Sequence, residues 1–303
     1  MSKEPIIISI GGGKGGIGKS TVTTNIGTAL VQKDYRVGFI DADLGGANLH
    51  HCLGIKRPQT GLRDFITGTA KNLADVALAT PLPGSWLISG ASDIVELANP
   101  RFAQKKKMIA HLRTLDADYI LIDLGAGTGS NVTDFFAAFP CGIIVSDGSA
   151  ASIENAYGFL KNGIIRGLLR LFPGNKELQQ FIRRCSGSGN DLHYTTIGEM
   201  VAAAVQRFPD YARTMKEYLH AKRLFLVLNM VRRESDIRHG ERFAGIVKKY
   251  LSISLIYIGY VSWSEDVNAS FRAMQPVMLH SNAAEVRNAF SSITANLVAL
   301  TRE

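Results

Sequence analysis

The sequence predicts an α/β fold with a mostly parallel, twisted sheet that carries helices on both faces. Short runs of β-branched and other apolar residues recur along the 303 residues, and segments of helical length separate them. A glycine-rich loop follows the first run and leads into a helical pattern. Buried parallel strands are near-continuous apolar runs, and alternation of strands with helices is typical of a parallel sheet covered on both sides.

Each expected strand is one of these apolar runs. In chain order the seven strands cover residues 5–10, 36–41, 85–90, 118–123, 142–146, 223–229 and 255–260. Segments of helical length lie between them, for example at 18–33, 100–115 and 235–251. A final helix over 283–300 has a stripe of apolar residues at three- and four-residue steps, which are Val286, Phe290, Ile293, Leu297 and Leu300. The stripe favours packing on the sheet over an alternative in which the helix lies on a membrane.

One region interrupts the alternation. Residues 159–222 contain no convincing strand and several helical stretches, so we expect one domain spanning 1–303 with a helical insertion at about 159–222. Between residues 161 and 184 one acid, Glu177, accompanies six basic residues, which are Lys161, Arg166, Arg170, Lys176, Arg183 and Arg184. Both a solvated helix face and a docking surface for lipid or a partner protein are consistent with this pattern.

The overall composition limits the class of protein. The chain is 46% hydrophobic and 20% charged, and no apolar stretch approaches the length of a membrane span. Its start lacks the features of a secretory signal, so we expect a cytoplasmic protein, with peripheral membrane attachment as a further candidate. The formal charge of +8 favours an acidic partner such as nucleic acid or an anionic lipid surface. Three widely spaced cysteines, Cys52, Cys141 and Cys185, are expected to be buried thiols.

The loop after the first strand carries the clearest chemical signal. Residues 13–20, GKGGIGKS, match the phosphate-loop pattern G-x-x-x-x-G-K-[ST] in the strand-to-helix context that the motif requires. This predicts a P-loop NTPase, in which backbone N–H groups and the positive end of the helix bind phosphates. The expected phosphate-binding residues are Gly13, Lys14, Gly15, Gly16, Ile17, Gly18, Lys19, Ser20 and Thr21. Lys19 is expected along the β and γ phosphates, Thr21 near the α phosphate, and Ser20 on Mg²⁺.

Carboxylates follow two other strands. Asp123 ends the fourth expected strand, where a phosphate loop requires an acid for the metal's water shell, and the small residues after it let Gly127 approach a γ phosphate. The second strand ends in DADLGGAN, so Asp41 and Asp43 share one side of the extended chain. We expect Asp43 to position the attacking water and Asp41 to support the metal's hydration shell, with a helix cap as the structural alternative for each.

Together these segments resemble a known family. KGGIGKS, DADLGGAN and DLGAG are similar to the deviant phosphate loop and switches of the MinD/ParA ATPases, P-loop proteins of the SIMIBI type. The resemblance extends over most of the chain, through SIENAYGFLK, VLNMVRRES and the segment from 255 to 279. These segments are similar to the corresponding ones in the branch of the family that contains the flagellar-number regulators FlhG and FleN, and in the MinD relatives of that branch.

The resemblance implies roles for residues that the phosphate-loop pattern leaves open. Lys14 is a second lysine that the phosphate-loop pattern does not require. It would reach across a homodimer to the partner's ATP, so that ATP holds the two subunits together. The alternative for Lys14 is a side chain turned to solvent. Asn229 would read the adenine edge, and the loop from Val261 to Glu265 would wall the base.

The leading hypothesis is therefore a slow Mg²⁺-dependent ATPase, a dimer with ATP, that positions a structure such as the flagellum or the division site. Lys14, Lys19 and Asp43 are its expected catalytic residues, and a partner protein is expected to stimulate hydrolysis. A DNA-partitioning ATPase that binds DNA non-specifically is one alternative. A non-catalytic, nucleotide-dependent regulator of a transcription or assembly factor is the other.

Two further clusters favour structural interpretations. The adjacent His50 and His51 point different ways on a helix or strand and lack an evident third ligand, so a metal site is not expected there. The run from Lys105 to Lys107 lies on an expected helix and is interpreted as a solvated face.

Overall fold

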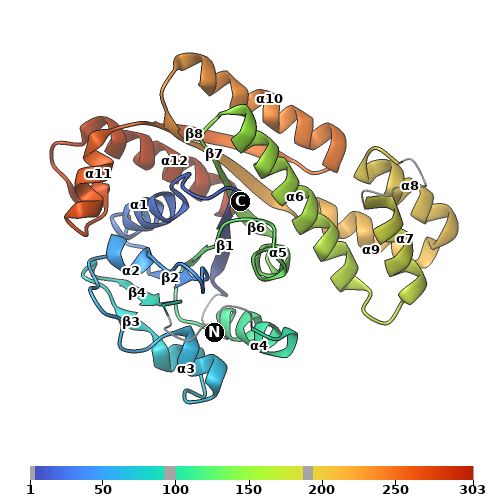
Figure 1. The fold of residues 1–303 in the computed structure, drawn as a ribbon, viewed down its shortest axis with the longest axis horizontal. Helices are drawn as coiled ribbons and strands as arrows, with labels where there is room; N and C mark the ends of the chain where they lie inside the picture. The colour runs from blue at the N-terminus through green and yellow to red at the C-terminus, as the bar shows by residue number, and fades with distance from the viewer. Residues whose placement is uncertain (1–3, 92–99, 187–193, 303) are drawn as a thin grey trace.

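The computed structural model describes residues 4–91, 100–186 and 194–302, and within these ranges eight strands form one sheet (Figure 1). In chain order the strands are β1 Ile6–Gly11, β2 Val37–Asp41, β3 Leu78–Ala79, β4 Ser85–Ile88, β5 Tyr119–Asp123, β6 Cys141–Ser146, β7 Arg223–Val231 and β8 Leu255–Ser262. Their order across the sheet is β3-β4-β2-β5-β1-β6-β7-β8, and the neighbours are parallel except for β3 with β4. The α/β prediction and the seven expected strands are confirmed, whereas β3 was not predicted.

Helices connect the strands. The α-helices are α1 Lys19–Val31, α2 Leu49–Cys52, α3 Leu62–Thr67, α4 Phe102–Leu112, α5 Ser130–Ala138, α6 Ala150–Leu171, α7 Lys176–Ser186, α8 Ile197–Arg207, α9 Pro209–His220, α10 Glu234–Leu251, α11 Glu265–Arg272 and α12 Ala284–Arg302. Two short 3₁₀ helices, η1 Leu73–Val76 and η3 Val277–Leu279, complete the labelled elements. Every helix in the described ranges falls short of the length or the apolar character that crossing a bilayer requires.

The sheet is buried on both faces, which explains its continuous apolar strands. Along β5, Ile120 and Ile122 belong to the core beneath α4, α5 and α6, while Tyr119 and Leu121 belong to the opposite core with α1 and α12. This alternation follows from the two-residue period of a strand. The predicted stripe of α12 faces the second core, with Val286, Phe290, Ile293 and Leu297 buried and Leu300 half-buried. The last helix therefore packs on the sheet, as predicted.

Strand register brings the polar motifs to one edge of the sheet. β1 lies between β5 and β6, and β2 lies on the other side of β5. Asp41 is paired with Asp123 across β2 and β5, and Ile10 is paired with the same Asp123 across β1 and β5. Since the carboxyl ends of parallel strands meet at one edge, the phosphate loop and both aspartates converge there.

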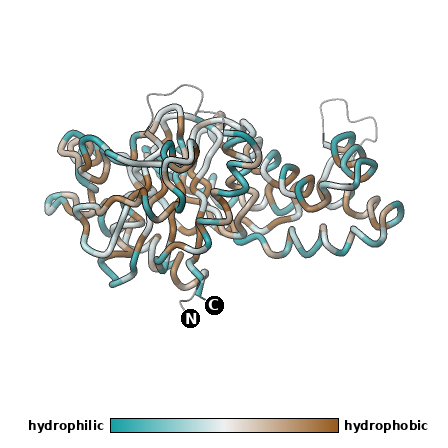
Figure 2. The backbone as a smooth tube through the Cα atoms, turned by 90° about the horizontal axis from the view of Figure 1, so that it is seen from below, coloured by the Kyte–Doolittle hydropathy of each residue, from teal (hydrophilic) through white to brown (hydrophobic). Residues whose placement is uncertain are grey.

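Helices α7, α8 and α9 form an arm at one end of the molecule (Figures 1 and 2). α7 and α9 pack on the far part of α6, and α8 packs on α9 and α10. Apolar side chains of the arm such as Phe181 and Met215 join the core that runs from the sheet along α6. Residue 159, where we expected the insertion to begin, lies within the continuous α6. Part of the expected insertion, residues 187–193, falls outside the described residues.

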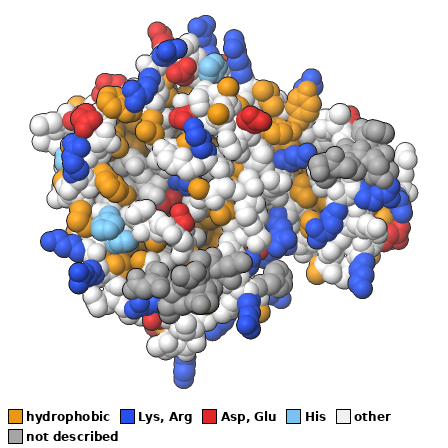
Figure 3. Space-filling view, viewed as in Figure 1, with side chains coloured by type: hydrophobic (Ala, Val, Ile, Leu, Met, Phe, Trp, Pro, Cys, Tyr) orange, Lys and Arg blue, Asp and Glu red, His pale blue; other side chains and the backbone are white. Residues whose placement is uncertain are grey.

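The expectation of a solvated face at Lys105–Lys107 is wrong for Lys105, because a buried carboxylate binds this lysine together with two arginines of α6. Asp134 on α5 is fully buried, and its carboxylate lies 2.6 Å from Lys105 Nζ, 2.6 Å from Arg166 Nε and 3.5 Å from Arg170 Nη1. The Lys105 side chain is only 6% exposed, so this lysine is not part of a solvated face. Arg166 and Arg170 join α6 to α5, and both alternatives for the rest of the basic stretch stay predictions. Other Lys and Arg side chains remain visible over the arm (Figure 3).

Candidate functional site

The phosphate loop has the backbone that its glycines allow. Gly13, Gly16 and Gly18 have φ values of +77°, +74° and +79°, a region that other residues occupy only with strain. Gly18 immediately precedes α1, so the chain turns directly into the helix and directs its first N–H groups toward the loop. This arrangement is the expected phosphate-binding geometry of a strand, a loop and a helix N-terminus.

The loop also rests closely on the start of α6. A Cβ on Gly13 would lie 2.3 Å from the backbone oxygen of Asn155, and a Cβ on Gly12 would lie 2.3 Å from that of Val145. Backbone atoms cannot yield at such distances, so glycine is required at both positions. The close packing fixes the loop over the β6–α6 junction.

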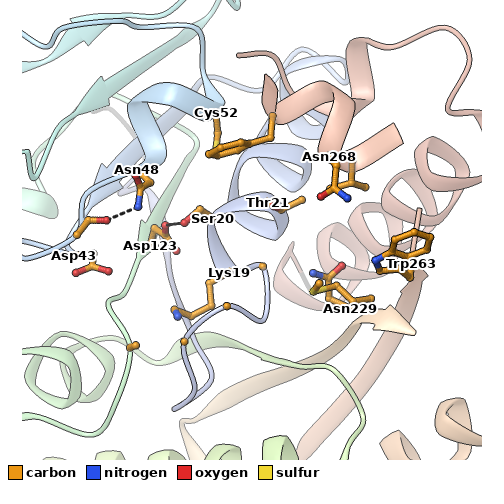
Figure 4. A pocket seen from close by; sticks show the side chains of 18 of the residues that line it. Lys19, Ser20, Thr21, Asp43, Asn48, Cys52, Asp123, Asn229, Trp263 and Asn268 are labelled. Carbon is orange, nitrogen blue, oxygen red and sulfur yellow. Dashed lines mark hydrogen bonds between the residues drawn. The ribbon is translucent and has the colours of Figure 1, made fainter. Parts of the chain in front are cut away.

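A cavity of about 420 Å³ opens beside the loop (Figure 4). Its lining combines α1, the segment after β2, the end of β5 and the ends of β7 and β8 with α11. Of the sequence-predicted residues, the lining contains Gly15, Gly16, Gly18, Lys19, Ser20, Thr21, Asp43, Asp123 and Asn229. Its volume lies within the range of sites for small ligands. The predicted residues that lie outside the lining are Gly13, Lys14, Ile17, Asp41 and Gly127.

Lys19 is held within the cavity. Its side chain is buried, and its Nζ donates to the backbone oxygen of Lys14 at 3.3 Å. Burial lowers the pKa of Lys19, while the nearby carboxylates of Asp123 and Asp43 partly offset this effect. A buried ammonium next to anionic groups can bind an anionic ligand without first losing a full water shell.

Ser20 and Asp123 form a compact pair at the end of β5. Ser20 Oγ donates to Asp123 Oδ2 at 2.5 Å, and Thr23 Oγ1 lies 3.4 Å from Asp123 Oδ1. Burial raises the pKa of Asp123, although the Ser20 hydroxyl and the Lys19 ammonium counteract it. A hard divalent cation would favour the ionised form of such a carboxylate, and oxygen donors are what Mg²⁺ prefers. The residues present therefore fit Mg²⁺.

Mg²⁺ bound with a triphosphate needs few protein ligands. Within the described ranges, no group of three or more His, Cys, Asp and Glu side chains has the arrangement of a metal site. Mg²⁺ usually keeps several waters and takes phosphate oxygens together with one or two protein atoms. Ser20 would contribute its hydroxyl directly, and Asp123 would accept hydrogen bonds from the metal's waters.

Asp41 and Asp43 occupy different environments. Asp41 is fully buried, and its carboxylate accepts hydrogen bonds from the backbone N–H groups of Asp43 at 3.1 Å and Leu49 at 3.0 Å. Leu49 is the first residue of α2, so Asp41 fixes the segment between β2 and that helix. Burial and the Asp123 carboxylate raise the pKa of Asp41. Its expected role in the hydration shell of the metal remains a prediction.

The Asp43 side chain lies in the cavity (Figure 4). A Cβ on Gly125 would lie 3.1 Å from Asp43 Oδ1, so a glycine after β5 lets the segment that follows β5 approach the segment that follows β2. This places the Asp43 carboxylate at the same end of the cavity as Lys19 and Asp123. The position is consistent with the expected role in orienting a water, which stays a prediction.

The remaining loop residues make contacts within the chain. The N–H of Gly127 donates to the backbone oxygen of Gly13 at 3.0 Å, which links the segment after β5 to the phosphate loop. Ile17 is buried, and its backbone oxygen accepts a hydrogen bond from Asn229 Nδ2 at 3.0 Å. Lys14 Nζ lies 3.5 Å from Asp147 Oδ2, outside the cavity lining.

The other end of the cavity combines apolar and aromatic side chains with serines and asparagines. The expected wall from Val261 to Glu265 contributes Ser262, Trp263 and Ser264, and Asn229 lies nearby (Figure 4). Sequence reasoning missed Met230, Asn268 and Phe271, which also line this end. Met230 could have been predicted, since it directly follows Asn229 in the sequence. Asn268 and Phe271 could not, because tertiary packing places α11 over the cavity.

Comparisons with known proteins agree with this geometry. The family model of the CobQ/CobB/MinD/ParA nucleotide-binding domain matches residues 8–277. The flagellum site-determining protein YlxH of Helicobacter pylori is 35% identical over 161 residues, which are 51% of this chain and 52% of that protein. The antiactivator FleN of Pseudomonas aeruginosa is 33% identical over 163 residues, which are 53% of this chain and 57% of that protein. The match thus spans about half the length of these curated relatives.

Solved structures share the fold over nearly the whole chain. The cell division ATPase MinD of Pyrococcus furiosus has a TM-score of 0.66 at 19% identity, with 98% of this chain and 99% of that chain covered. MinD of Pyrococcus horikoshii, solved with Mg-ADP, has a TM-score of 0.64 at 18% identity and coverage of 97% and 96%. MinD of Aquifex aeolicus, solved as a complex with MinC, gives the same four values. At these identities the likeness establishes a common fold.

Proposed function

Because the chain belongs to the CobQ/CobB/MinD/ParA nucleotide-binding family, we propose that it is a Mg²⁺-dependent ATPase that forms a homodimer with ATP and positions a cellular structure. The names of a relative, a flagellum site-determining protein, and of a structural neighbour, a cell division ATPase, support the flagellum or the division site as that structure. The whole of residues 1–303 would act as one phosphate-loop domain, with the arm as a helical insertion.

The separation of two lysines on one loop is the observation that carries this proposal. Lys19 is buried and lies in the cavity, while Lys14 is 41% exposed and lies outside its lining. Lys19 would bind the phosphates of its own subunit's nucleotide. Lys14 would bind phosphate oxygens on the facing subunit, where two triphosphates would otherwise repel each other. Hydrolysis would remove that attraction and release the dimer.

The chemistry of hydrolysis would be shared among the residues at the phosphate end of the cavity. Bound Mg²⁺ would neutralise part of the charge on the β and γ phosphates. Ser20 and Asp123 would hold it, and the backbone N–H groups of the loop would orient the phosphates. Asp43 would accept a hydrogen bond from the attacking water and so direct it toward the γ phosphate.

The base end of the cavity favours adenine over guanine. Asn229 Nδ2 donates to the Ile17 backbone oxygen, and Asn268 Nδ2 donates to Glu265 Oε2 at 3.0 Å. These bonds orient both amides, and each amide keeps its carbonyl oxygen and one further N–H for a ligand. Adenine offers an amino donor beside a ring-nitrogen acceptor, whereas guanine offers two acceptors there, so an amide of this kind would suit adenine better. Trp263 would contribute an aromatic face for stacking.

We also propose that a protein partner stimulates hydrolysis and that attachment to a membrane would be peripheral. The solved complex of MinD with MinC supports a protein partner, since it is a structural neighbour bound to another protein. The formal charge of +8 gives one specific reason to keep non-specific DNA binding as a second candidate. Steep salt dependence of DNA binding that requires ATP would favour the second candidate, and absence of binding at low salt would remove it.

Phosphate release from purified protein tests the enzymatic proposal. We expect Mg²⁺-dependent release with ATP, loss with Lys19→Ala, and a decrease of about 100-fold or more with Asp43→Ala, since general-base contributions are of this order. Glu177→Gln is a matched control, because Glu177 lies on the arm in an exposed ion pair with Arg207. Equal release by the wild type and Asp43→Ala would contradict the assignment of Asp43, and no release under any condition would favour a non-catalytic regulator.

A further inference from the structure

Asp147 lies at the carboxyl end of β6, next to the phosphate loop, and has no part in the site described above. Its Oδ2 lies 3.5 Å from Lys14 Nζ, while its backbone directly follows the last residue of the strand. The contact joins the cation that we assign to the partner's nucleotide with an anion of the same subunit. An ammonium that turned toward a phosphate across a dimer would give up part of its interaction with this carboxylate.

Asp147 is held in place by its own loop. Its Oδ1 accepts hydrogen bonds from the N–H of Ser149 at 2.9 Å and from Ser149 Oγ at 2.6 Å. Its own N–H donates to Ser152 Oγ at 3.2 Å, and the backbone oxygen of Gly148 lies 3.0 Å from His239 Nδ1. The carboxylate is therefore oriented before any ligand binds, with Oδ2 directed at Lys14.

The charge state of Asp147 suits an ionic contact. Burial acts to raise the pKa of Asp147, but the hydrogen bonds from Ser149 and the Lys14 ammonium outweigh it and leave this pKa below its usual value. The carboxylate is thus ionised at neutral pH. The close packing of Gly13 on Asn155 keeps the loop, and with it Lys14, next to this carboxylate.

We propose that Asp147 is a positioning residue that holds Lys14 in the nucleotide-free subunit and opposes dimerisation until a partner's triphosphate competes for the same ammonium. This inference rests on the proposed function, since it concerns the lysine assigned to the facing nucleotide. It adds a regulatory contact in cis, so that the threshold for ATP-dependent dimerisation is set partly by an acid outside the nucleotide cavity.

The contact between Lys14 and Asp147 is strong enough to weaken dimerisation but too weak to prevent it. The two side chains are 41% and 25% exposed, and a partly exposed ion pair changes an equilibrium by about fivefold at most. A triphosphate with Mg²⁺ presents several oxygens and more charge, so it can displace one carboxylate. Each dimer releases two lysines. Removal of Asp147 should therefore tighten the ATP-bound dimer by about two- to fivefold per lysine, or about four- to twenty-fivefold in total.

The experiment measures the dimer dissociation constant of the full chain by sedimentation equilibrium with Mg²⁺ and a non-hydrolysable ATP analogue. Asp147→Asn keeps an acceptor for Ser149 but removes the charge, and it should dimerise about four- to twenty-fivefold more tightly than the wild type. Asp147→Glu restores the charge and should return the constant toward the wild-type value. Ser149→Ala, which loosens Asp147, should shift it in the same direction as Asp147→Asn but less. Glu177→Gln, in a remote ion pair, should leave it unchanged.

Two further measurements separate this role from a structural one. The difference between Asp147→Asn and the wild type should shrink at about 1 M salt, because ions screen a partly exposed pair. ADP binding by the monomer should be the same in both proteins, since Lys14 contacts nucleotide only across the dimer. A difference that salt leaves unchanged, or Asp147→Glu behaving like Asp147→Asn, would overturn the assignment.

The Lys14→Ala variant distinguishes the two levels of the argument. If Lys14→Ala stays monomeric with the analogue while Asp147→Asn dimerises no more tightly than the wild type, the holding role of Asp147 is wrong and the proposed function stands. If Lys14→Ala dimerises like the wild type, the cross-subunit role of Lys14 fails, and the role of Asp147 fails with it.

Discussion

At the scale of single residues, the burial of Asp41 and Asp123 makes their ionised forms unfavourable, and a bound cation would stabilise those forms. Both carboxylates are buried at adjacent strand ends, and burial raises the pKa of each above its usual value. A carboxyl group that is harder to ionise when folded makes the folded chain bind more protons than the unfolded chain. Its contribution to stability is therefore fully present at low pH and is lost as the pH rises through the raised pKa.

Asp123→Asn should consequently stabilise the nucleotide-free protein while it removes Mg²⁺-dependent activity. We expect the free energy of unfolding at pH 8 without Mg²⁺ to increase by about 1–2 kcal/mol, because the substitution removes a buried charge but keeps an acceptor for Ser20. At pH 5 the gain should be smaller, since the wild-type carboxyl is then largely protonated. Urea unfolding at the two pH values measures this. A variant less stable than the wild type at pH 8 would contradict the account.

Substitution of Asn229 tests the base-binding end of the cavity, because the phosphate loop orients the amide of this residue. Asn229→Ala should weaken ATP binding by about tenfold and reduce the preference for ATP over GTP, since a lost hydrogen bond is worth about 1 kcal/mol and removal also frees the Ile17 carbonyl. Titration of each nucleotide by calorimetry measures both effects. Asn268→Ala serves as a comparison on α11. An unchanged ratio of ATP to GTP affinity in the Asn229 variant would show that another group reads the base.

The residues of the sequence motifs could be predicted, whereas contacts between segments far apart in the sequence could not. The phosphate loop, Asp43, Asp123 and Asn229 were predicted to share a site, and the structure brings them to one cavity. Asp147 directly follows the strand 142–146, at the same edge of the sheet as Asp41 and Asp123, so the argument from strand ends would have identified it. The burial of Lys105 could not be predicted, because Asp134 lies on another helix and its position depends on packing.

At the scale of elements, α5 connects the nucleotide site with the rest of the molecule. It begins at Ser130, shortly after the segment 123–129 that we expect to respond to the γ phosphate. Its buried Asp134 binds Lys105 of α4 and Arg166 of α6. Burial acts to raise the pKa of Asp134, but the hydrogen bonds and charges of Arg166 and Lys105 outweigh it and lower this pKa. A shift of α5 would therefore be transmitted to α4 and α6 together.

Asp134→Asn should destabilise the protein by about 3–5 kcal/mol, because it leaves the buried Lys105 without its carboxylate. Chemical denaturation measures the change. Glu177→Gln provides the matched control, since it breaks an exposed ion pair with Arg207 and should cost at most about 1 kcal/mol. Equal effects of the two substitutions would mean that the Asp134 cluster contributes no more than a surface pair.

The long apolar elements were predictable and the short ones were not. Strands buried on both faces, such as β5 and β6, are continuous apolar runs that leave few alternatives. β3 forms the edge of the sheet and pairs only with β4, and its two residues are too few to show a period. The helical insertion was expected to begin at about residue 159, but that residue lies in the middle of α6, which follows β6 and continues to Leu171. The sequence of one continuous helix does not show where that helix leaves the sheet.

At the scale of the whole molecule, the account depends on association. The two lysines of the phosphate loop would bind two nucleotides, one in each subunit of a dimer. In the single chain Lys19 lies in the cavity, whereas Lys14 lies outside its lining and contacts Asp147. The function we propose is therefore a property of two chains, and ATP would control whether they associate.

The most direct test compares the wild type with Lys14→Ala by sedimentation equilibrium, with Mg²⁺ and either a non-hydrolysable ATP analogue or ADP. The exposed Lys33, at the end of α1, provides a control as Lys33→Ala. We predict that the wild type and Lys33→Ala are dimers with the analogue and monomers with ADP, whereas Lys14→Ala is monomeric with both. Dimerisation of Lys14→Ala equal to that of the wild type with the analogue would contradict the central claim.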